Sequence, residues 1–371
     1  MDHRTGTEGL FEAAQGFALK GTLKDCIPYG NGHINDTFLI TYQQNQQDVT
    51  YILQRMNKKI FTCPEKLMEN IMGVTRFLQD KIKKAGGDPQ RETLNFALTL
   101  EKKPYFIDSF GEYWRVARFI DQAYALDEVK TPNDFYQSAL AFGRFQQMLA
   151  DYPADTLYET IPDFHNTAIR FEAFKKAVEK DICHRAGNVQ EEIRFVMEHE
   201  ELAHALEKLS ASGECPLRVT HNDTKSNNVL IDEVTGKGIC VIDLDTVMPG
   251  LAVNDFGDSI RFGASTAAED EKDLSKVSCS MELFEAYVKG FLEGCGGQLT
   301  EGEIANLPLG AKVMTYECGM RFLTDYLSGD TYFKIHRPEH NLDRARTQFK
   351  LVSDMENKWD QMQAILNNVR K

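Results

Sequence analysis

The stretch that decides the fold is residues 221–228, which read His221-Asn222-Asp223-Thr224-Lys225-Ser226-Asn227-Asn228. Fifteen residues after Asn228, an apolar run ends in Asp243. Asp223 and Asn228 stand five residues apart, so a loop rich in turn-forming residues can direct both side chains into one cleft. The next strand then brings Asp243 beside them. We therefore expect three oxygen-bearing side chains to converge on one site.

The spacing of these three residues matches a known chemistry. In kinase-type phosphoryl transfer, an aspartate orients the attacking hydroxyl, while an asparagine and a second aspartate bind metal ions. Asp223 is therefore the candidate catalytic residue. Asn228 and Asp243 are candidate Mg²⁺ ligands, because Mg²⁺ prefers few, hard oxygen donors. A lone loop aspartate usually caps a turn, but the ordered set favours catalysis. Lys225 is a candidate for neutralising charge on the transferred phosphoryl group.

Other polar residues near this stretch have different interpretations. His221 is expected to brace the loop through hydrogen bonds. Asp245 lies on the same side of an extended segment as Asp243; it either supports the metal site from behind or adds a metal ligand, and we favour the first. Asp255-Phe256-Gly257 spells the metal motif of protein kinases but lies too far along the chain. Asp255 and Asp258 are therefore expected to cap or buttress a helix.

Composition narrows the class of protein. The chain has 371 residues, of which 42% are hydrophobic and 26% charged, as in ordinary soluble domains. No apolar run reaches the roughly 18 residues that span a bilayer, and no signal-peptide segment is evident. The net charge of −14 argues against nucleic-acid or anionic-membrane binding. The 8 scattered cysteines favour free thiols over disulfides or zinc. We expect a cytoplasmic monomer.

The segment pattern predicts a small β-rich lobe followed by a larger helical lobe. The first part suggests strands over 17–29, 37–41, 50–56, 94–100 and 113–119, with helices over 7–15 and 63–84. Helical periodicity then covers 133–150, 167–180, 189–210, 281–293, 301–327 and 342–369. We expect an α+β fold with a five-stranded antiparallel sheet and one helix in residues 1–120. Residues 121–371 would form a mainly helical lobe with the catalytic loop, and a nucleotide would bind between the lobes.

Nucleotide contacts are expected from the first lobe. The loop Gly30-Asn31-Gly32-His33 lies between two expected strands and can bring backbone N–H groups against phosphates. G-x-G in a hairpin is nevertheless more often only a turn. Kinases clamp the phosphates with a lysine on the third strand, paired with a glutamate on the next helix. Here Arg55 is the nearby cation, or Gln54 occupies its register, and Glu65 or Glu69 is the expected helix partner.

Several stretches together carry a family resemblance. They are Pro28-Tyr29-Gly30-Asn31-Gly32-His33-Ile34-Asn35-Asp36-Thr37, Leu53-Gln54-Arg55-Met56-Asn57, Leu67-Met68-Glu69-Asn70, His221-Asn222-Asp223-Thr224-Lys225, Ile242-Asp243-Leu244-Asp245-Thr246-Val247-Met248-Pro249-Gly250, Arg321-Phe322-Leu323-Thr324-Asp325-Tyr326-Leu327 and His340-Asn341-Leu342. With these stretches the chain resembles the N-acetylhexosamine 1-kinases of the aminoglycoside phosphotransferase superfamily.

The resemblance implies a two-lobed, protein-kinase-like fold that uses ATP and Mg²⁺. The implied reaction is phosphorylation of the anomeric hydroxyl of free N-acetylglucosamine or N-acetylgalactosamine. It assigns a sugar pocket to His33, Phe262, Arg321 and Tyr332, with Asp223 at the hydroxyl. Aromatic rings can stack on a pyranose, and arginine and histidine can donate to its hydroxyls. At the lobe boundary, the candidate nucleotide contacts are Arg118, Phe119 and Ile120.

Three alternatives stay open at this point. Another kinase of the superfamily would act on choline, homoserine, methylthioribose or an aminoglycoside. A protein kinase is disfavoured, because no activation segment ends in A-P-E. A pseudokinase would use the fold only for binding, against which the intact Asp223, Asn228 and Asp243 speak.

Overall fold

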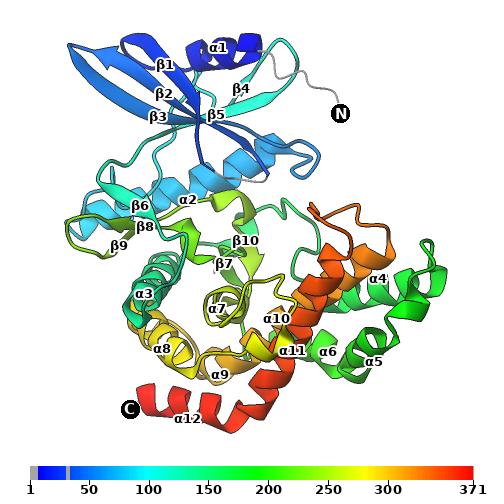
Figure 1. Ribbon diagram of the computed structural model, residues 1–371. Coiled ribbons are helices and arrows are strands. Elements are labelled where there is room, and N and C mark those ends of the chain that lie inside the picture. Colours follow the sequence, from blue (N-terminus) through cyan, green and yellow to red (C-terminus); the bar gives the residue numbers. More distant parts are fainter. Residues whose placement is uncertain (1–6, 31–33, 371) are drawn as a thin grey trace.

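The computed structural model describes residues 7–30 and 34–370 and has a β-rich part above a helical part (Figure 1). The upper part holds a five-stranded antiparallel sheet with the strand order β1-β2-β3-β5-β4. Its strands are β1 (Thr22–Pro28), β2 (Asp36–Gln44), β3 (Gln47–Arg55), β4 (Phe106–Ile107) and β5 (Tyr113–Arg118). This arrangement confirms the predicted α+β, two-lobed fold class.

Two helices flank the sheet on opposite sides. Helix α1 (Thr7–Gly16) packs its apolar residues, such as Leu10 and Ala13, against inward-facing sheet residues such as Leu53. Helix α2 (Pro64–Lys84) lies beneath the sheet (Figure 1) and starts with a proline, whose missing N–H costs nothing at that position. Side chains alternate along a strand, so neighbouring residues of β3 face α1 and the helical part in turn.

The predicted strand over 94–100 is wrong. The fifth strand is β4, and residues 94–100 form only isolated bridges, one of them from Phe96 to Ala117. The Asn95 side chain donates to the carbonyls of Pro89 and Thr93, each at 2.8 Å. These local bonds engage the chain before Phe96, and the segment meets β5 at an isolated bridge rather than along a strand.

The lower part combines small β-elements with helices. Strands β6 (Ala123–Ala125), β8 (Val229–Asp232) and β9 (Gly238–Val241) form one sheet, and β7 (Arg218–Thr220) pairs with β10 (Met248–Gly250). The helices are α3 (Pro132–Met148), α4 (Thr167–Lys180), α5 (Gln190–Glu198), α6 (Glu200–Ala211), α7 (Ala252–Gly263), α8 (Met281–Cys295), α9 (Glu301–Ala305), α10 (Leu307–Leu327), α11 (His340–Asn357) and α12 (Trp359–Val369). Within the described ranges, no helix has both the length and the apolar character to cross a bilayer.

Three predicted helices each divide into two. The breaks fall at His199, Asn306 and Lys358, between α5 and α6, α9 and α10, and α11 and α12. At the second break Pro308 stands in the first turn of α10. A proline fits a helix start and disrupts a helix interior, so the chain begins a new helix there. Periodicity continues across such a break, which is why the sequence pattern did not reveal it.

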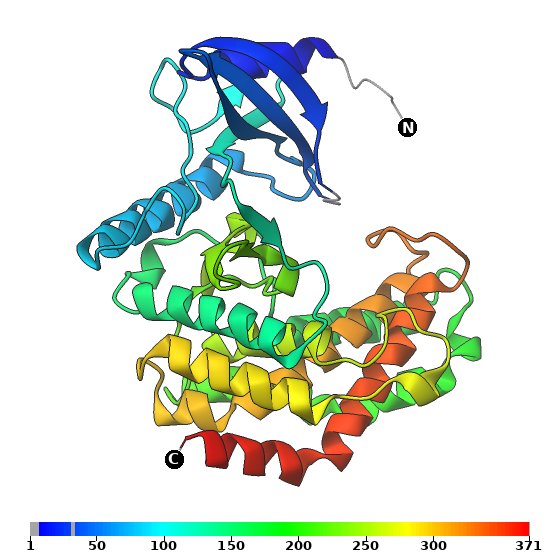
Figure 2. The same cartoon turned by 60° about the vertical axis from the view of Figure 1, so that its left-hand side comes forward.

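Helices α3 and α8 lie side by side (Figure 2) and approach closely at glycines. A Cβ built on Gly294 would lie 2.5 Å from the carbonyl oxygen of Leu140 and 2.9 Å from the Cα of Gly143. Only glycine fits this crossing. The central helix α7 is buried along nearly its whole length and supports the loop described next.

Candidate active site

Residues 221–228 form a loop between β7 and β8 in which the predicted catalytic residues meet. The Asn228 side chain donates from Nδ2 to the Asp223 carbonyl at 2.8 Å and to Asp223 Oδ2 at 3.1 Å. On the other side, Lys225 Nζ lies 3.0 Å from Asp223 Oδ1. Asp223 is therefore held between an amide and a cation, with part of its carboxylate accessible to solvent.

Asp243 follows β9 and is joined to this loop. The Ile242 N–H donates to the Asn228 carbonyl at 2.9 Å, which fixes the two segments together. Asp243 has a left-handed backbone with φ of 58°, a conformation that costs energy for a residue other than glycine. Such strain is common where a backbone must direct a side chain into a site.

The electrostatic surroundings of Asp243 and Lys225 differ. Asp243 is in part exposed to solvent, but its carboxyl is surrounded by many protein atoms. Desolvation raises its pKa to about 6, and the carboxylates of Asp245 and Asp223 add to the rise. Burial alone would lower the pKa of Lys225, but its contact with Asp223 and the charge of Asp258 raise it. Lys225 is therefore protonated, while Asp243 experiences an excess of negative charge.

Helix α7 supports the loop from below through two carboxylates. Asp255 accepts hydrogen bonds from the N–H of His221 at 2.9 Å and of Asn222 at 2.8 Å. Asp258 accepts from the N–H of Thr224 at 3.0 Å. Neither caps a helix, which was one of the two roles expected for them. They instead fix the backbone on both sides of Asp223.

His221 joins the loop to the segment before Asp243. Its Nε2 lies 2.8 Å from the Ile242 carbonyl, and its Nδ1 accepts from the N–H of Asp223 at 3.3 Å. The ring is completely buried. These contacts are those of a bracing residue, as the sequence suggested.

Arg55, predicted as the phosphate clamp, lies on the α1 side of the sheet. Its Nη2 is 2.5 Å from Asp36 Oδ2, and its guanidinium carbon is 5.8 Å from the centre of the Trp114 ring. Glu65 accepts from the Tyr113 hydroxyl, so it has a tyrosine rather than a strand cation as its partner. Gln54 faces the helical part and accepts from Arg115 Nε at 2.9 Å.

The nucleotide candidates Arg118, Phe119 and Ile120 lie where the chain passes from β5 to β6. Gly30 has a φ of 73° and open space around it, while Asn31, Gly32 and His33 fall outside the described residues. Phe119 meets Tyr29 edge to face, with ring centres 5.9 Å apart. Arg118 is exposed and Ile120 is buried as the chain crosses toward β6.

Three of the sugar candidates, Phe262, Arg321 and Tyr332, lie in the described helical part. Arg321 on α10 lies among three aromatic rings, 5.5 Å from Phe164, 5.9 Å from Tyr332 and 5.6 Å from Phe333, measured to ring centres. Tyr332 is 62% exposed, and Phe262, on the last turn of α7, is 38% exposed. The structure therefore joins Arg321 to Tyr332 and leaves both aromatic candidates open to solvent.

Asp325 organises the loop that carries Tyr332. Its Oδ1 accepts from the N–H groups of Thr331 at 2.9 Å and Tyr332 at 2.8 Å. Its Oδ2 accepts from the N–H of Phe333 and from Asn341 Nδ2, both at 2.9 Å. Sequence reasoning assigned no role to Asp325. The available signal was the position of this aspartate on the inward side of an apolar helix. A buried carboxylate needs hydrogen-bond partners, so such a residue is expected to organise the backbone near it.

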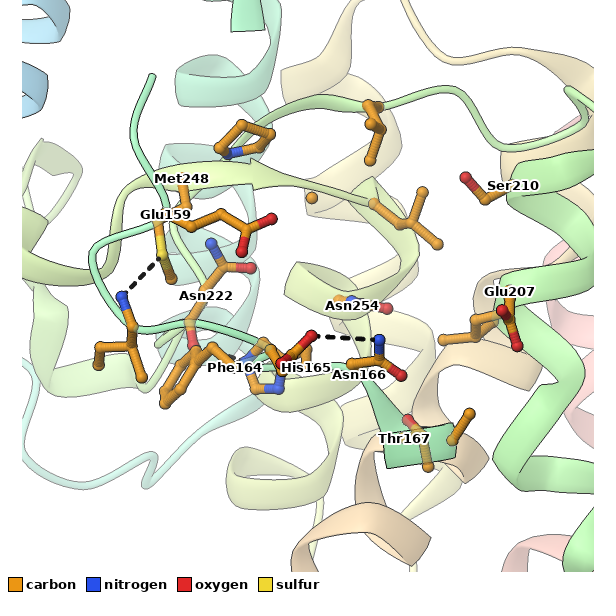
Figure 3. A pocket seen from close by; sticks show the side chains of 18 of the residues that line it. Glu159, Phe164, His165, Asn166, Thr167, Glu207, Ser210, Asn222, Met248 and Asn254 are labelled. Carbon is orange, nitrogen blue, oxygen red and sulfur yellow. Dashed lines mark hydrogen bonds between the residues drawn. The ribbon is translucent and has the colours of Figure 1, made fainter. Parts of the chain in front are cut away.

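A cavity of about 400 Å³ lies behind the catalytic loop (Figure 3). Its wall includes Asn222 but none of Asp223, Asn228 and Asp243. His165 lies in this wall, with Nε2 3.0 Å from the Asn222 carbonyl and Nδ1 2.9 Å from Glu317. Burial alone would lower the pKa of His165, but its contacts with Glu317 and the Asn222 carbonyl and the charge of Asp258 together raise it. The cavity is thus a separate space, linked to the site through the loop backbone.

The residues present fit a divalent cation. Asn228 and Asp243 offer hard oxygen donors, and the negative charge around Asp243 is offset only in part by Arg115 and His221. No group of three or more His, Cys, Asp or Glu suited to a metal occurs in the described part of the chain. A two-ligand site completed by phosphate oxygens is what Mg²⁺ commonly uses.

A two-lobed fold with this loop between β7 and β8 is that of a kinase-like phosphotransferase. The chain belongs to the phosphotransferase enzyme family, whose sequence profile matches residues 25–275. Three solved structures are similar to it at low identity. A microcompartment-associated aminopropanol kinase is 15% identical with a TM-score of 0.63, covering 96% of this chain and 99% of that one.

The names of the other two similar structures give different phosphoryl acceptors. A choline kinase from Cryptosporidium parvum is 15% identical with a TM-score of 0.56, covering 94% of this chain and 93% of that one. A spectinomycin phosphotransferase solved with ADP and spectinomycin is 14% identical with a TM-score of 0.52, covering 90% and 92%. At these identities the likeness supports the fold and leaves the acceptor open.

Proposed function

We propose that this chain is an ATP- and Mg²⁺-dependent kinase that phosphorylates the anomeric 1-hydroxyl of N-acetylglucosamine or N-acetylgalactosamine. The pairing of Asp223 with Asn228 and Lys225, beside Asp243, is the observation that carries the phosphotransferase chemistry. The sequence resemblance carries the choice of acceptor. The proposal places nucleotide binding in residues 1–120 and the acceptor in residues 121–371 of a cytoplasmic monomer.

Each residue of the loop then has a defined task. Asp223 accepts a hydrogen bond from the acceptor hydroxyl and aligns its oxygen for in-line attack. In a loose transition state the proton can leave late, so orientation matters more than early proton removal. Protonated Lys225 offsets charge on the transferred group. Mg²⁺ held by Asn228 and Asp243 would neutralise charge on the nucleotide phosphates.

The charge of the acceptor side favours a neutral acceptor. Arg321 lies there among aromatic rings, and the partly buried Arg170 is close enough to repel it electrostatically. A third cation such as choline or an aminoglycoside would add to this repulsion, which the carboxylates of Glu317 and Asp163 offset only in part. An acetylated amino sugar is neutral, its ring can stack on Tyr332, and its oxygens can accept from Arg321.

A substrate panel with ATP and Mg²⁺ tests the proposal. It should contain both N-acetylhexosamines, their 1-deoxy analogues, glucose, choline, aminopropanol and spectinomycin. We expect turnover of the N-acetylhexosamines and none of the 1-deoxy sugars. Phosphorylation of a 1-deoxy sugar, or preference for a cationic acceptor, would overturn it.

The variant Asp223→Asn tests the catalytic role separately. It keeps the shape of the side chain and should lower kcat by about 10³-fold, with ADP binding retained in calorimetry. A near-wild-type rate would refute the role of Asp223. Loss of ADP binding as well would mean that the loop had lost its structure.

A further inference from the structure

Arg115 is a buried cation on the sheet face that is turned toward the helical part. It lies on β5, and only 3% of its surface is exposed. Its Nε donates to Gln54 Oε1 at 2.9 Å, and its Nη1 forms an ion pair with Asp245 Oδ1. Asn35 donates to the other oxygen, Asp245 Oδ2, at 2.6 Å. The guanidinium therefore joins the sheet to the segment that carries Asp243.

Stability alone does not explain such a group. Taking an arginine and an aspartate out of water costs several kcal/mol, and apolar residues of similar size often serve the fold as well. Both side chains here are at least 95% buried. The position is also specific, because Asp245 stands two residues after Asp243, and the charge of Arg115 acts on Asp243.

Strand β3, which pairs with β5, lacks the inward-facing cation that kinases carry on their third strand. Kinases need a cation on the sheet above the phosphates, normally on the third strand. On β3 the residue facing the cleft is Gln54, which is neutral, while Arg55 points to the α1 side and pairs with Asp36. Gln54 and Arg115 are directly opposite each other across β3 and β5. Arg115 thus presents a positive charge on the same sheet face, one strand away.

We propose that Arg115 is the residue that binds the nucleotide phosphates, oriented by Gln54 and Asp245. This inference rests on the proposed function only in its use of a nucleoside triphosphate, and not on the sugar. Nη2 has no hydrogen-bond partner within residues 7–30 and 34–370, so it can donate to a phosphate oxygen while Nε and Nη1 keep their contacts. Asn35, through Asp245, ties the chain after Gly30 to the same group.

Calorimetry with ADP and with adenosine tests the assignment without any acceptor. In the presence of Mg²⁺, Arg115→Gln should weaken ADP binding by about 10- to 100-fold, the scale of one charged hydrogen bond, and leave adenosine binding within about twofold. Asp245→Asn removes the competing anion and keeps a hydrogen-bond acceptor. Because this variant keeps an acceptor that orients Arg115, it should weaken ADP binding less than Arg115→Gln does and leave adenosine binding within about twofold.

The Asp245→Asn variant separates phosphate binding from a purely structural link between the two parts. If the pair only held the parts together, both variants would weaken ADP and adenosine alike, and the proposal would fail. It would also fail if Arg55→Gln lost ADP affinity while Arg115→Gln kept it. Arg218→Gln, which breaks the buried pair with Glu303, is the matched control for disrupting an ion pair and should bind ADP normally.

Folding is checked by near-ultraviolet circular dichroism. If Arg115→Gln is unfolded, the double variant Arg115→Gln/Asp245→Asn, which leaves no unpaired buried charge, replaces it with the same expected loss of ADP binding. Normal ADP binding by a folded double variant overturns the proposal. A negative sugar panel with selective loss of ADP binding would refute the sugar and retain Arg115.

Discussion

Replacing Asp325 by asparagine should loosen the loop that carries Tyr332. The side chain keeps its size, but one acceptor oxygen becomes an amide donor. If the amide takes the place of Oδ2, it faces the N–H of Phe333 and Asn341 Nδ2, which are both donors. If it turns over, it faces the N–H groups of Thr331 and Tyr332 instead. Two of the four hydrogen bonds are lost in either orientation.

The magnitude follows from the kind of bond that is lost. A hydrogen bond to a charged group contributes about 1.5–3 kcal/mol. Water can reach parts of this loop and satisfy some of the freed donors, so the low end applies and the expected loss is about 3 kcal/mol. Because about 1.4 kcal/mol corresponds to tenfold in affinity, the KM for the acceptor should rise by about 10- to 100-fold.

Steady-state kinetics and hydrogen exchange together measure this effect. The KM for ATP should change by less than about twofold, because the loop lies on the acceptor side, and amide exchange should accelerate over residues 328–339. The matched control is Asp354→Asn, since Asp354 accepts from the N–H of Cys279 at 2.7 Å away from the site. It should lower stability without changing either KM.

Two results would refute this reasoning in different ways. Unchanged exchange over the loop would mean that Asp325 does not hold it. Faster exchange with an unchanged acceptor KM would mean that Tyr332 and its neighbours do not contact the acceptor.

Three further variants test the support of the site and the helix packing. Asp255→Ala leaves the buried N–H groups of His221 and Asn222 without an acceptor, so chemical denaturation should show a loss of about 3 kcal/mol and kcat should fall; wild-type values for both would contradict the buttressing role. His165→Gln tests linkage: the pKa of His165 lies above its ordinary 6.5, so the stability from its protonated form is fully present below pH 6.5 and is lost as pH rises through the folded value. The stability difference from wild type should therefore shrink with rising pH, and a flat profile would contradict it. Gly294→Ala gains up to about 1 kcal/mol in helix propensity, but its Cβ would overlap the Leu140 carbonyl, so a net loss of about 2 kcal/mol is expected in denaturation, and a stabilised variant would disprove the close approach.

The meeting of Asp223, Lys225 and Asn228 in one loop was predictable because its signal is local. Asp223, Lys225 and Asn228 stand within six residues of the sequence. The short apolar run before Asp243 predicts a strand that leads back to them. The two-lobed fold class followed from the change between strand and helix periodicity. The predicted helix starts were correct where a proline or a capping residue stands, as at Pro64 and at Asn166, the N-cap before Thr167.

The errors arose where periodicity did not carry the deciding information. The segment 94–100 has strand-like composition, yet the side chain of Asn95 bonds to the local backbone and the segment forms only isolated bridges. The helices over 189–210 and 301–327 keep their apolar spacing across breaks that a sequence pattern does not register. Composition gives only the preference of each residue for a helical or strand backbone. A single hydrogen bond from a side chain to the backbone can override that preference.

The sequence by itself determined the reaction chemistry, since the residue types and spacing of one loop restrict what the site can do. Only the tertiary structure decided which cation faces the cleft and what positions Tyr332. A strand alternates its faces, so one residue of register separates Arg55 on the outer side from Gln54 on the inner side, and pairing with β5 brings Arg115 opposite Gln54. Such neighbours are 61 residues apart along the chain, and only folding brings them together.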